Sequence, residues 1–455
     1  MEKISLKKIA EVVGAECESD LFITSICTDT RNIEKGCLFI AFSGENFDAH
    51  NFVEEAAKKG AAAVLCQREV ECSAPVLYVK DTRTAYLDIA GFYRSQFEIP
   101  LIGITGSVGK TTTKDFVALG LSAKYKTLKT KGNFNNDIGM PRTLLELDSS
   151  YEAAVIEMGM NHFGEIHNLT LRSKPTMGVI TNIGVSHIEN LGSREGILKA
   201  KLEILDGMSE DAPLILNADN DLLAEVKIDG RPVYYFGIEN EKADFRAVDI
   251  KSEGASTSFT VVYPDGEKEI SVPAVGNHIV LNAVCAFAVG ILNRVDADSL
   301  AKKLGEYVPS GMRQRQVDCG EFVVIEDCYN ASPDSMRAAI TTLTGLNTGK
   351  KIAVLGDMLE LGEFSEKFHS DVGKIAAESG VDVLLCYGKD SRFYKSSAEE
   401  NGIKKALHFE DQSELLEHLI KEIEQGSAVL FKASHGMHLE NVIKELYERK
   451  GIKNE

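Results

Sequence analysis

Short apolar runs alternate with stretches of helical period along most of the chain. In the first hundred residues, four apolar runs predict strands and two stretches of period 3.6 predict helices. The predicted strands are residues 21–26, 37–42, 62–66 and 76–79, and the predicted helices are residues 52–59 and 84–97. An alternation of strands and helices indicates an α/β fold.

A second segment begins at Pro100, and its pattern predicts a parallel sheet. The predicted strands are residues 101–105, 153–157, 177–183, 213–217 and 233–236. The first three are almost continuously apolar, which is typical of parallel strands covered on both faces. Residues 244–273 instead alternate between polar and apolar, which predicts an antiparallel addition beside the parallel core, and residues 282–292 are predicted to form a buried helix.

The third segment again alternates strands with helices. Its predicted strands are residues 322–326, 351–355, 381–387 and 428–432. A helix is predicted after Ser332, which can serve as N-cap with Pro333 in the first turn, and others after Gly362, Asp411 and Met437. This pattern indicates a Rossmann-like domain without the glycine fingerprint. We therefore predict three α/β domains, at residues 1–97, 98–309 and 310–455.

A phosphate-binding loop is predicted where the strand at 101–105 ends, in the sequence PLIGITGSVGKTTTKD. The predicted phosphate-binding residues are Gly106, Ser107, Val108, Gly109, Lys110, Thr111 and Thr112. Small residues let backbone N–H groups approach phosphates, the lysine adds positive charge, and the threonine hydroxyl can reach Mg²⁺. The strict P-loop spacing requires a glycine where Ile104 stands, so an accidental strand–turn–helix is the alternative interpretation.

Charge and composition restrict the class of protein. The formal net charge of −19 over 455 residues argues against a general nucleic-acid or anionic-membrane binder. Phosphorylated ligands would then need local basic groups and Mg²⁺. The longest apolar run, residues 283–292, is too short to cross a bilayer, and the nine cysteines form no C-x-x-C pair. We expect a cytoplasmic protein with reduced thiols.

Polar residues at the ends of the central strands are candidates for metal binding. Glu157 ends one predicted strand, and a carboxylate across from Thr111 could complete the coordination of Mg²⁺. His187 follows the next strand and is either a second metal ligand or a structural imidazole.

Several other polar stretches do not decide between structure and function by themselves. Residues 28–31 and 43–50 form either turns or a loop for an anionic substrate, and the amide-rich stretch 131–141 allows the same two interpretations. Residues 199–203 have the pattern of a solvated helix face. Arg313 and Arg315 form either an interdomain salt bridge or a cationic contact to ATP phosphates.

Taken together, these stretches resemble the Mur ligase family of ATP-dependent amide-bond ligases, in the right order and over nearly the whole chain. The matching stretches are residues 28–31, 44–50, 106–112, 136–141, 157–159, 183–187, 199–204, 327–336, 354–363 and 432–440. The family loop has the short form T-G-x-x-G-K-[ST], which residues 105–111 match. The stretches around Asp327 and Asp357 are the most specific signals.

The resemblance implies a two-step reaction. ATP phosphorylates the terminal carboxylate of UDP-N-acetylmuramoyl-tripeptide, and the amine of D-Ala-D-Ala then attacks the acyl phosphate and expels phosphate. It implies a UDP-sugar-binding first domain, a central ATP-binding P-loop domain and a Rossmann-like third domain for the acceptor dipeptide. ATP and two Mg²⁺ ions are the implied cofactors, and we expect a monomer that binds neither nucleic acid nor membrane.

The resemblance also implies roles for individual residues. Lys110 would hold phosphates, Thr111 and Glu157 the first Mg²⁺, and His187 the second, supported by a carbamylated Lys201, for which Lys199 is the alternative. Asn282, Arg313 and Asp327 would contact the nucleotide. The implied substrate-binding residues are Thr30, Arg31, Gly44, Asp48, His50, Asn136, Asn161, His162 and Asn330.

Two alternatives remain open at the level of sequence. One is another ligase of the same superfamily, which adds a different amino acid, or glutamate to folate. The other is a nucleotide-switch protein that uses the P-loop without ligation. A switch protein needs one Mg²⁺ and no lysine at a second metal, so Glu157, His187 and Lys201 distinguish the two classes.

Overall fold

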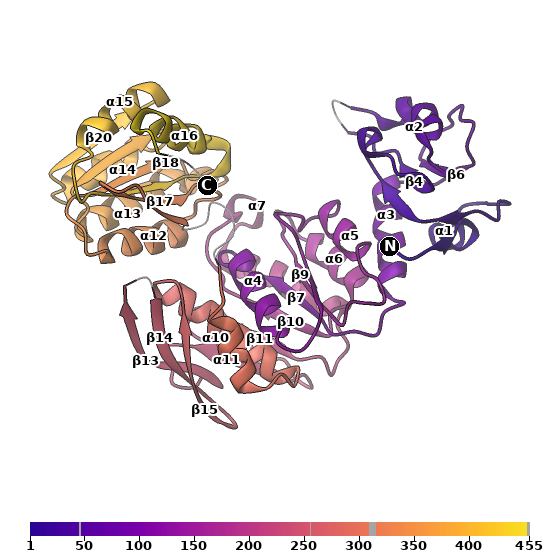
Figure 1. Ribbon diagram of the computed structural model, residues 1–455, viewed down its shortest axis with the longest axis horizontal. Helices are drawn as coiled ribbons and strands as arrows, with labels where there is room; N and C mark the ends of the chain where they lie inside the picture. Colours follow the sequence, from indigo (N-terminus) through magenta and orange to yellow (C-terminus); the bar gives the residue numbers. More distant parts are fainter. Residues whose placement is uncertain (45–46, 255, 309–314, 453–455) are drawn as a thin grey trace.

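A computed structural model describes residues 1–44, 47–254, 256–308 and 315–452. The N-terminal and C-terminal segments lie on either side of the central segment (Figure 1). Each of the three main sheets takes its strands from one of the three predicted domains. The proposed limits between the domains stay predictions. In the described part of the chain, no helix is long and apolar enough to span a bilayer.

The N-terminal segment is built on a parallel sheet of order β3-β4-β5-β6. Its strands are β1 (Ile4–Ser5), β2 (Phe22–Ile23), β3 (Ser25–Cys27), β4 (Cys37–Ile40), β5 (Ala63–Cys66) and β6 (Val76–Tyr78), and its helices are α1 (Leu6–Val13), α2 (Val53–Lys59) and α3 (Thr82–Arg94). The predicted strand 21–26 is divided, because β2 pairs with β1 and β3 with β4. α3 begins two residues early, where the Asp81 side chain caps the helix.

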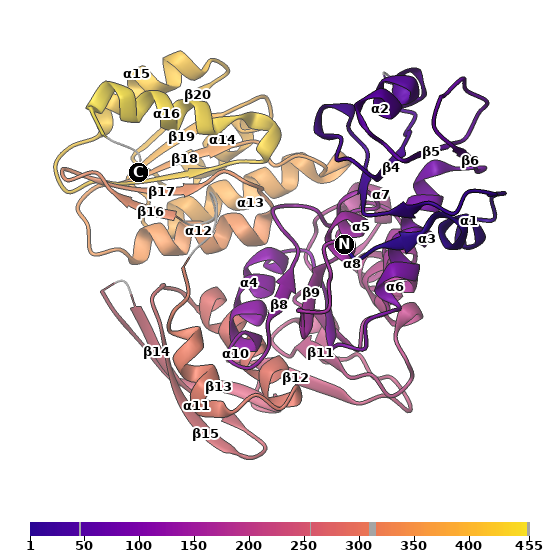
Figure 2. The same cartoon turned by 45° about the vertical axis from the view of Figure 1, so that its right-hand side comes forward.

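The central segment contains one sheet of nine strands in the order β15-β14-β13-β12-β11-β10-β7-β9-β8. Its strands are β7 (Leu101–Thr105), β8 (Thr127–Lys129), β9 (Ala153–Glu157), β10 (Met177–Ile180), β11 (Leu214–Asn217), β12 (Val233–Gly237), β13 (Phe245–Glu253), β14 (Ser256–Tyr263) and β15 (Gly266–Val272). The antiparallel addition is confirmed, and it continues the parallel sheet at its β12 edge, far from the N-terminal segment (Figure 2).

Helices cover both faces of the parallel part of this sheet. They are α4 (Lys110–Leu121), α5 (Gly139–Leu144), α6 (Glu165–Ser173), α7 (Ile188–Leu191), α8 (Arg194–Leu202), α9 (Asp221–Ala224), α10 (Asn277–Leu292) and α11 (Ala297–Leu304). α4 and α10 pack on one face. On the other face α5 and α6 also contact α3, so the N-terminal segment shares a core with the central one.

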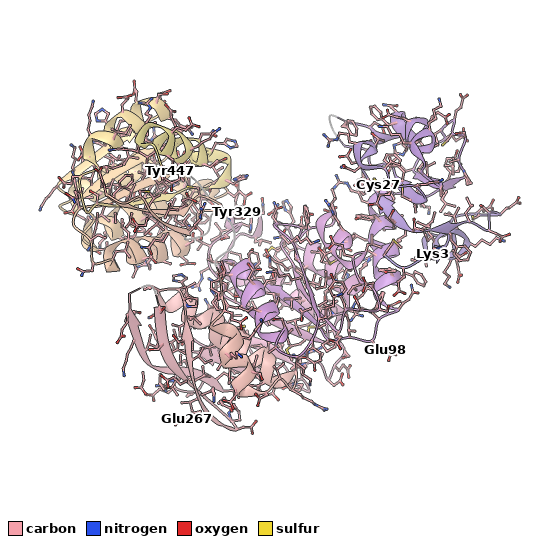
Figure 3. The ribbon with its side chains drawn as sticks, in the orientation of Figure 1. Lys3, Cys27, Glu98, Glu267, Tyr329 and Tyr447 are labelled. Atoms are coloured by element: carbon pink, nitrogen blue, oxygen red, sulfur yellow. The ribbon has the colours of Figure 1, made fainter. Side chains whose placement is uncertain are left out.

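The C-terminal segment is a six-stranded sheet of order β16-β17-β21-β18-β19-β20, and only β16 is antiparallel to its neighbour. Its elements are β16 (Arg315–Asp318), β17 (Val323–Asp327), α12 (Pro333–Gly345), β18 (Lys351–Gly356), α13 (Ser365–Glu378), β19 (Val383–Tyr387), α14 (Arg392–Glu400), β20 (Lys405–Phe409), α15 (Gln412–Glu422), β21 (Ala428–Lys432) and α16 (Leu439–Lys450). Tyr447 lies inside this segment, and Tyr329 lies on the side nearest the central sheet (Figure 3).

Close packing of α13 against α14 makes Gly373 a sensitive position. A Cβ added to Gly373 would lie 2.3 Å from the backbone oxygen of Tyr394. We expect Gly373→Ala to lower the free energy of unfolding by about 1–3 kcal/mol, because the two backbones would have to separate. Gly345→Ala is the matched control, since no atom lies within 4 Å of its added Cβ. Denaturant unfolding of both variants measures the difference, and equal stability would contradict the prediction.

Candidate active site

The order of the central strands brings three functional stretches together. β7 lies between β9 and β10, and all three strands are parallel. Their carboxyl ends therefore meet at one edge of the sheet, where ligands bind in open α/β folds. The phosphate loop at 106–109 follows β7, Glu157 is the last residue of β9, and the stretch 181–187 follows β10.

Gly106 and Gly109 give the phosphate loop its shape. Gly106 has φ 153°, and a Cβ there would lie 1.9 Å from Oγ1 of Thr181, so a larger residue would displace the end of β10. Gly109 has φ 84° in the left-handed region and precedes the first turn of α4. The glycines thus allow the loop to lie directly against the neighbouring strand end.

Asn182 holds the loop in this conformation, a contact that sequence analysis missed. Its backbone oxygen accepts a hydrogen bond from Ser107 N at 3.0 Å, and its side-chain oxygen accepts one from Val108 N at 2.7 Å. The Lys110 ammonium donates to the Gly106 carbonyl at 2.8 Å. Two loop amides and the lysine are therefore bound within the protein here, and would have to exchange partners to contact phosphates.

Thr111 and Glu157 lie side by side, as expected from their positions. The Thr111 hydroxyl donates to Glu157 Oε2 at 2.7 Å, and Asn135 Nδ2 donates to Oε1 at 2.8 Å. The Lys114 ammonium is 3.9 Å from the same carboxylate, whose residue is only 1% exposed. One hydroxyl and one carboxylate suit Mg²⁺ that also binds phosphate oxygens. Asn135 lies in the amide-rich stretch 131–141, and its hydrogen bond to Glu157 was not predicted from the sequence.

His187 precedes α7 with a left-handed backbone, φ 64°. Its Nδ1 atom is buried and lies 2.8 Å from Oε2 of Glu360 in the C-terminal segment, although the angle is not that of a hydrogen bond. The Nδ1 side of the His187 ring therefore faces a carboxylate of the C-terminal segment. The role of His187 as a metal ligand stays a prediction.

Lys201 and Lys199 lie in very different surroundings on α8. Lys201 is 2% exposed, and burial, followed by repulsion from Lys110, holds its pKa well below the ordinary value. Lys199 is exposed, with its ammonium 5.9 Å from the centre of the Phe163 ring. Only Lys201 is thus buried and near the phosphate-loop lysine, which contradicts the interpretation of the whole 199–203 stretch as a solvated face.

The residues expected to contact nucleotide are partly described. Asn282 is 8% exposed and its side-chain oxygen accepts a hydrogen bond from Thr113 at 2.7 Å, which places it beside the first turns of α4. Asp327 forms an ion pair of 2.7 Å with Lys432, which also donates to the Asn330 backbone oxygen. Arg313 lies outside the described residues. Arg315 lies 3.5 Å from Glu326, within its own domain.

The candidate UDP-sugar residues belong to the N-terminal segment and precede the phosphate loop in the sequence. Arg31 forms an ion pair with Asp29, whose pKa it lowers to about 2, mainly through side-chain hydrogen bonds. His50 is buried, with Nδ1 2.6 Å from Asp48 and Nε2 accepting from Gln67 N. Both ring nitrogens of His50 are thus used inside the domain, whereas the Arg31 side chain is 85% exposed.

The remaining predicted substrate residues have local or exposed positions. Thr30 accepts a hydrogen bond from Lys59 through its carbonyl, and the Gly44 amide donates to the Phe47 carbonyl. The Asn136 side-chain oxygen accepts hydrogen bonds from Ile138 N at 3.2 Å and Gly139 N at 2.9 Å, just before and at the start of α5. Asn161 and His162 are exposed in the loop between β9 and α6. Their binding roles stay predictions.

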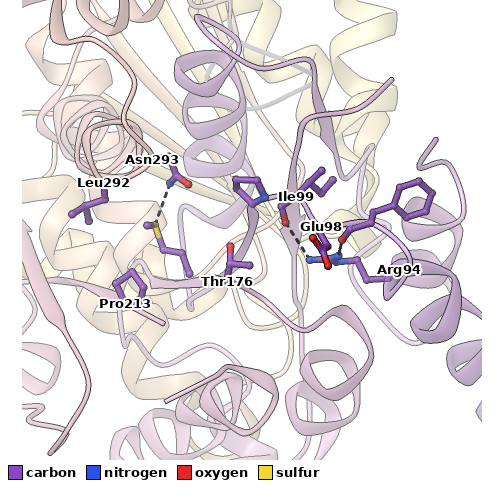
Figure 4. A pocket seen from close by; sticks show the side chains of 10 residues that line it. Arg94, Glu98, Ile99, Thr176, Pro213, Leu292 and Asn293 are labelled. Atoms are coloured by element: carbon purple, nitrogen blue, oxygen red, sulfur yellow. Dashed lines mark hydrogen bonds between the residues drawn. The ribbon is translucent and has the colours of Figure 1, made fainter. Parts of the chain in front are cut away.

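A pocket of about 510 Å³ lies elsewhere, at the amino ends of the central strands (Figure 4). Pro100, Thr176 and Pro213, which precede β7, β10 and β11, line it. Arg94 lies beside it and donates to the carbonyls of Phe97 and Ile99. The pocket is therefore at the opposite edge from the phosphate loop.

Among the described residues, no three His, Cys, Asp or Glu side chains gather as a metal site. In nucleotide sites Mg²⁺ is usually bound by one or two protein groups together with phosphate oxygens, and Thr111 and Glu157 would be those groups here. A glycine-rich loop, a helix N-terminus, a lysine and a threonine–carboxylate pair at adjacent strand ends define a P-loop nucleotide-binding protein.

Comparison with known proteins identifies the family. Models of the Mur ligase family match residues 22–94 (catalytic domain), 104–290 (middle domain) and 312–435 (glutamate ligase domain). The chain belongs to the Mur ligase family.

Two full-length relatives carry the same name, UDP-N-acetylmuramoyl-tripeptide–D-alanyl-D-alanine ligase. The one from Bacillus subtilis (strain 168) is 40% identical and the one from Escherichia coli (strain K12) is 36% identical, each over 98% of this chain and 99% of the relative. A crystal structure of MurF from Acinetobacter baumannii is 33% identical with a TM-score of 0.92, covering 98% of this chain and 99% of that one.

The similarity extends to a structure with bound nucleotide. MurF ligase from Thermotoga maritima, in complex with ADP, is 27% identical with a TM-score of 0.86, covering 94% of this chain and 98% of that one. The predicted three-domain α/β fold, with a central P-loop sheet and a C-terminal Rossmann-like sheet, is confirmed.

Proposed function

We propose that this protein is an ATP-dependent, ADP-forming ligase that joins D-Ala-D-Ala to UDP-N-acetylmuramoyl-tripeptide in the synthesis of peptidoglycan precursors. The observation that carries the proposal is the full-length identity of 40% and 36% to two relatives named for this reaction. The adjacent phosphate loop, Thr111, Glu157 and Lys201 supply groups suited to such a reaction.

The chemistry needs concentrated positive charge. The substrate carboxylate attacks the γ-phosphorus of ATP, ADP leaves, and an acyl phosphate forms. The dipeptide amine then attacks the acyl carbon, loses a proton, and phosphate leaves as the amide bond is made. Because the first step brings two anions together, Lys110 and the N-terminus of α4 serve to hold the phosphates of ATP against their mutual repulsion.

Magnesium would neutralise the phosphate charge in this reaction. Thr111 and Glu157 would hold one ion, and their contact of 2.7 Å supports this assignment. His187 and Lys201 would hold the second, with Lys201 carbamylated. Support for the carbamate comes from burial, since a low pKa leaves more of the amine neutral and able to attack CO₂.

The three segments would divide the substrates among them. The N-terminal segment would bind the UDP-sugar, with the exposed Arg31 as a candidate for its phosphates. The C-terminal segment would bind the acceptor dipeptide near Asn330 and close over the nucleotide. We further propose a cytoplasmic monomer.

The test is phosphate release from Mg-ATP with UDP-N-acetylmuramoyl-tripeptide, with and without D-Ala-D-Ala, while the peptide product is followed by mass. We expect release that depends on both substrates and yields the pentapeptide. Turnover with a single amino acid in place of the dipeptide would show that the protein is a ligase of the same family with a different acceptor. Absence of turnover with every acceptor would contradict ligase function.

A further inference from the structure

The stretch that carries His187 is a docking surface for the C-terminal segment. α7 packs against the 3₁₀ turn Gly362–Phe364, and α7 lies beside the C-terminal segment in Figure 1. Phe364 and Phe368 of that segment pack on the core that contains Ile188 and Leu191 of α7. The position of His187 is thus tied to the placement of the C-terminal segment.

A second contact reinforces this docking at the other end of the stretch. A Cβ added to Gly184 would lie 2.3 Å from Oδ2 of Asp334, the second residue of α12, and 3.4 Å from Cβ of Ser107 in the phosphate loop. The Asp334 carboxylate therefore reaches the loop's immediate surroundings. The stretch between Gly184 and α7 is held by the C-terminal segment on both sides of His187.

Glu360 and His187 both have an unusual, left-handed backbone conformation at their point of contact. Glu360 has φ 62° and His187 has φ 64°, a region that non-glycine residues adopt rarely and at a cost. Gly362 has φ 52°, and a Cβ on it would lie 3.0 Å from Cγ of Glu189. The loop after β18 is thus shaped to bring Glu360 up to the histidine ring.

The chemistry of the pair suggests what this contact does. A metal-binding histidine commonly donates its other ring N–H to a carboxylate, which fixes the tautomer and the orientation of the ring. Glu360 Oε2 is 2.8 Å from Nδ1 of His187, which makes Nε2 the ring nitrogen that can face a metal ion. A small turn of the ring would align the Nδ1–H group with the carboxylate.

We infer that Glu360 is a positioning residue for His187: it accepts the Nδ1–H proton and so presents Nε2 to the second Mg²⁺. The inference rests on the proposed function of His187. Because Glu360 belongs to the C-terminal segment, the metal site is complete only while that segment is docked. Phosphoryl transfer would thereby wait for the domain that brings the acceptor.

The test uses the full chain with ADP and with Mn²⁺ in place of Mg²⁺. Pulsed electron paramagnetic resonance reports the coupling of Mn²⁺ to an imidazole nitrogen, and titration reports Mn²⁺ affinity. We expect the coupling in the native protein, its loss in His187→Ala, and its weakening in Glu360→Ala together with an affinity about 10- to 100-fold lower. Glu360→Gln keeps an acceptor oxygen and should retain the coupling.

Glu363→Ala is the matched control, because Glu363 is an exposed carboxylate on the same loop. It should leave both coupling and affinity unchanged. Native coupling and affinity in Glu360→Ala, equal losses in the Glu360→Ala and Glu363→Ala variants, or no nitrogen coupling in the native protein would each overturn the inference. These readouts do not require ligation, so failure of the proposed substrates in the phosphate-release assay is a separate result.

Discussion

Replacing Lys201 with alanine is expected to lower the rate of ligation about 10²- to 10³-fold. As a carbamate, the Lys201 side chain would be a buried anion, and burial strengthens its interaction with a metal ion. Alanine removes the anion and leaves a space at a position that is 2% exposed. Acetate or formate can enter that space, so we expect these small carboxylates to restore part of the activity.

Lys199→Ala is the control for this prediction, because Lys199 is on the same helix and exposed. It should keep nearly the native rate. The assay is phosphate release with product mass, repeated over a range of acetate and formate concentrations, and the intact protein should carry the mass of one added CO₂. A fully active Lys201→Ala variant would rule out the carbamate, whereas inactivity without rescue would leave the lysine a structural role.

The sequence predicted the parts of the fold that follow from periodicity. Central strands such as β7 and β9 were foreseen because they are almost continuously apolar, as is typical of parallel strands covered on both faces. β1, β8, β16 and β20 were missed, and β1 is only two residues long. β8 is only three residues long, and β16 and β20 include exposed charged residues such as Asp318 and Lys405, so their sequences resemble loops.

Some residues of the candidate site could likewise be predicted from the sequence, and others could not. Residues at strand ends, such as Glu157, could be placed beside the phosphate loop because parallel strands end at one edge. Contacts that depend on side-chain direction or domain placement could not be foreseen. Asn182 was seen only as the end of a strand, and Glu360 meets His187 through a loop of another segment.

The burial of Lys201 shows the limit of helical periodicity. The stretch 199–203 contains two lysines and a glutamate, and its charges alone indicate a solvated face. α8 instead turns Lys201 inward and Lys199 outward, since residues two apart on a helix point in different directions. Only the family resemblance singled out Lys201, because local sequence does not say which face of α8 the rest of the protein covers.

Replacing Glu157 with glutamine is expected to lower the rate about 10²- to 10³-fold and to raise the Mg²⁺ concentration needed for half-maximal phosphate release. Glutamine keeps the shape of the side chain but removes the charge that would bind the ion. It also puts an amide group where Oε2 or Oε1 now accepts hydrogen bonds from Thr111 and Asn135. Lys114, 3.9 Å from Glu157, loses one of its neighbouring carboxylates, while that of Asp115 at 3.6 Å remains.

A pair of variants at Thr111 separates metal binding from packing. Thr111→Ser keeps the hydroxyl and should show a Mg²⁺ dependence close to that of the native protein. Thr111→Val keeps the volume, loses the oxygen, and should shift the Mg²⁺ dependence in the same direction as Glu157→Gln. Since the hydroxyl and the carboxylate would bind the same ion, combining Thr111→Val with Glu157→Gln should cost less than the product of the separate effects. Unchanged Mg²⁺ dependence in Glu157→Gln would remove Glu157 from the metal site.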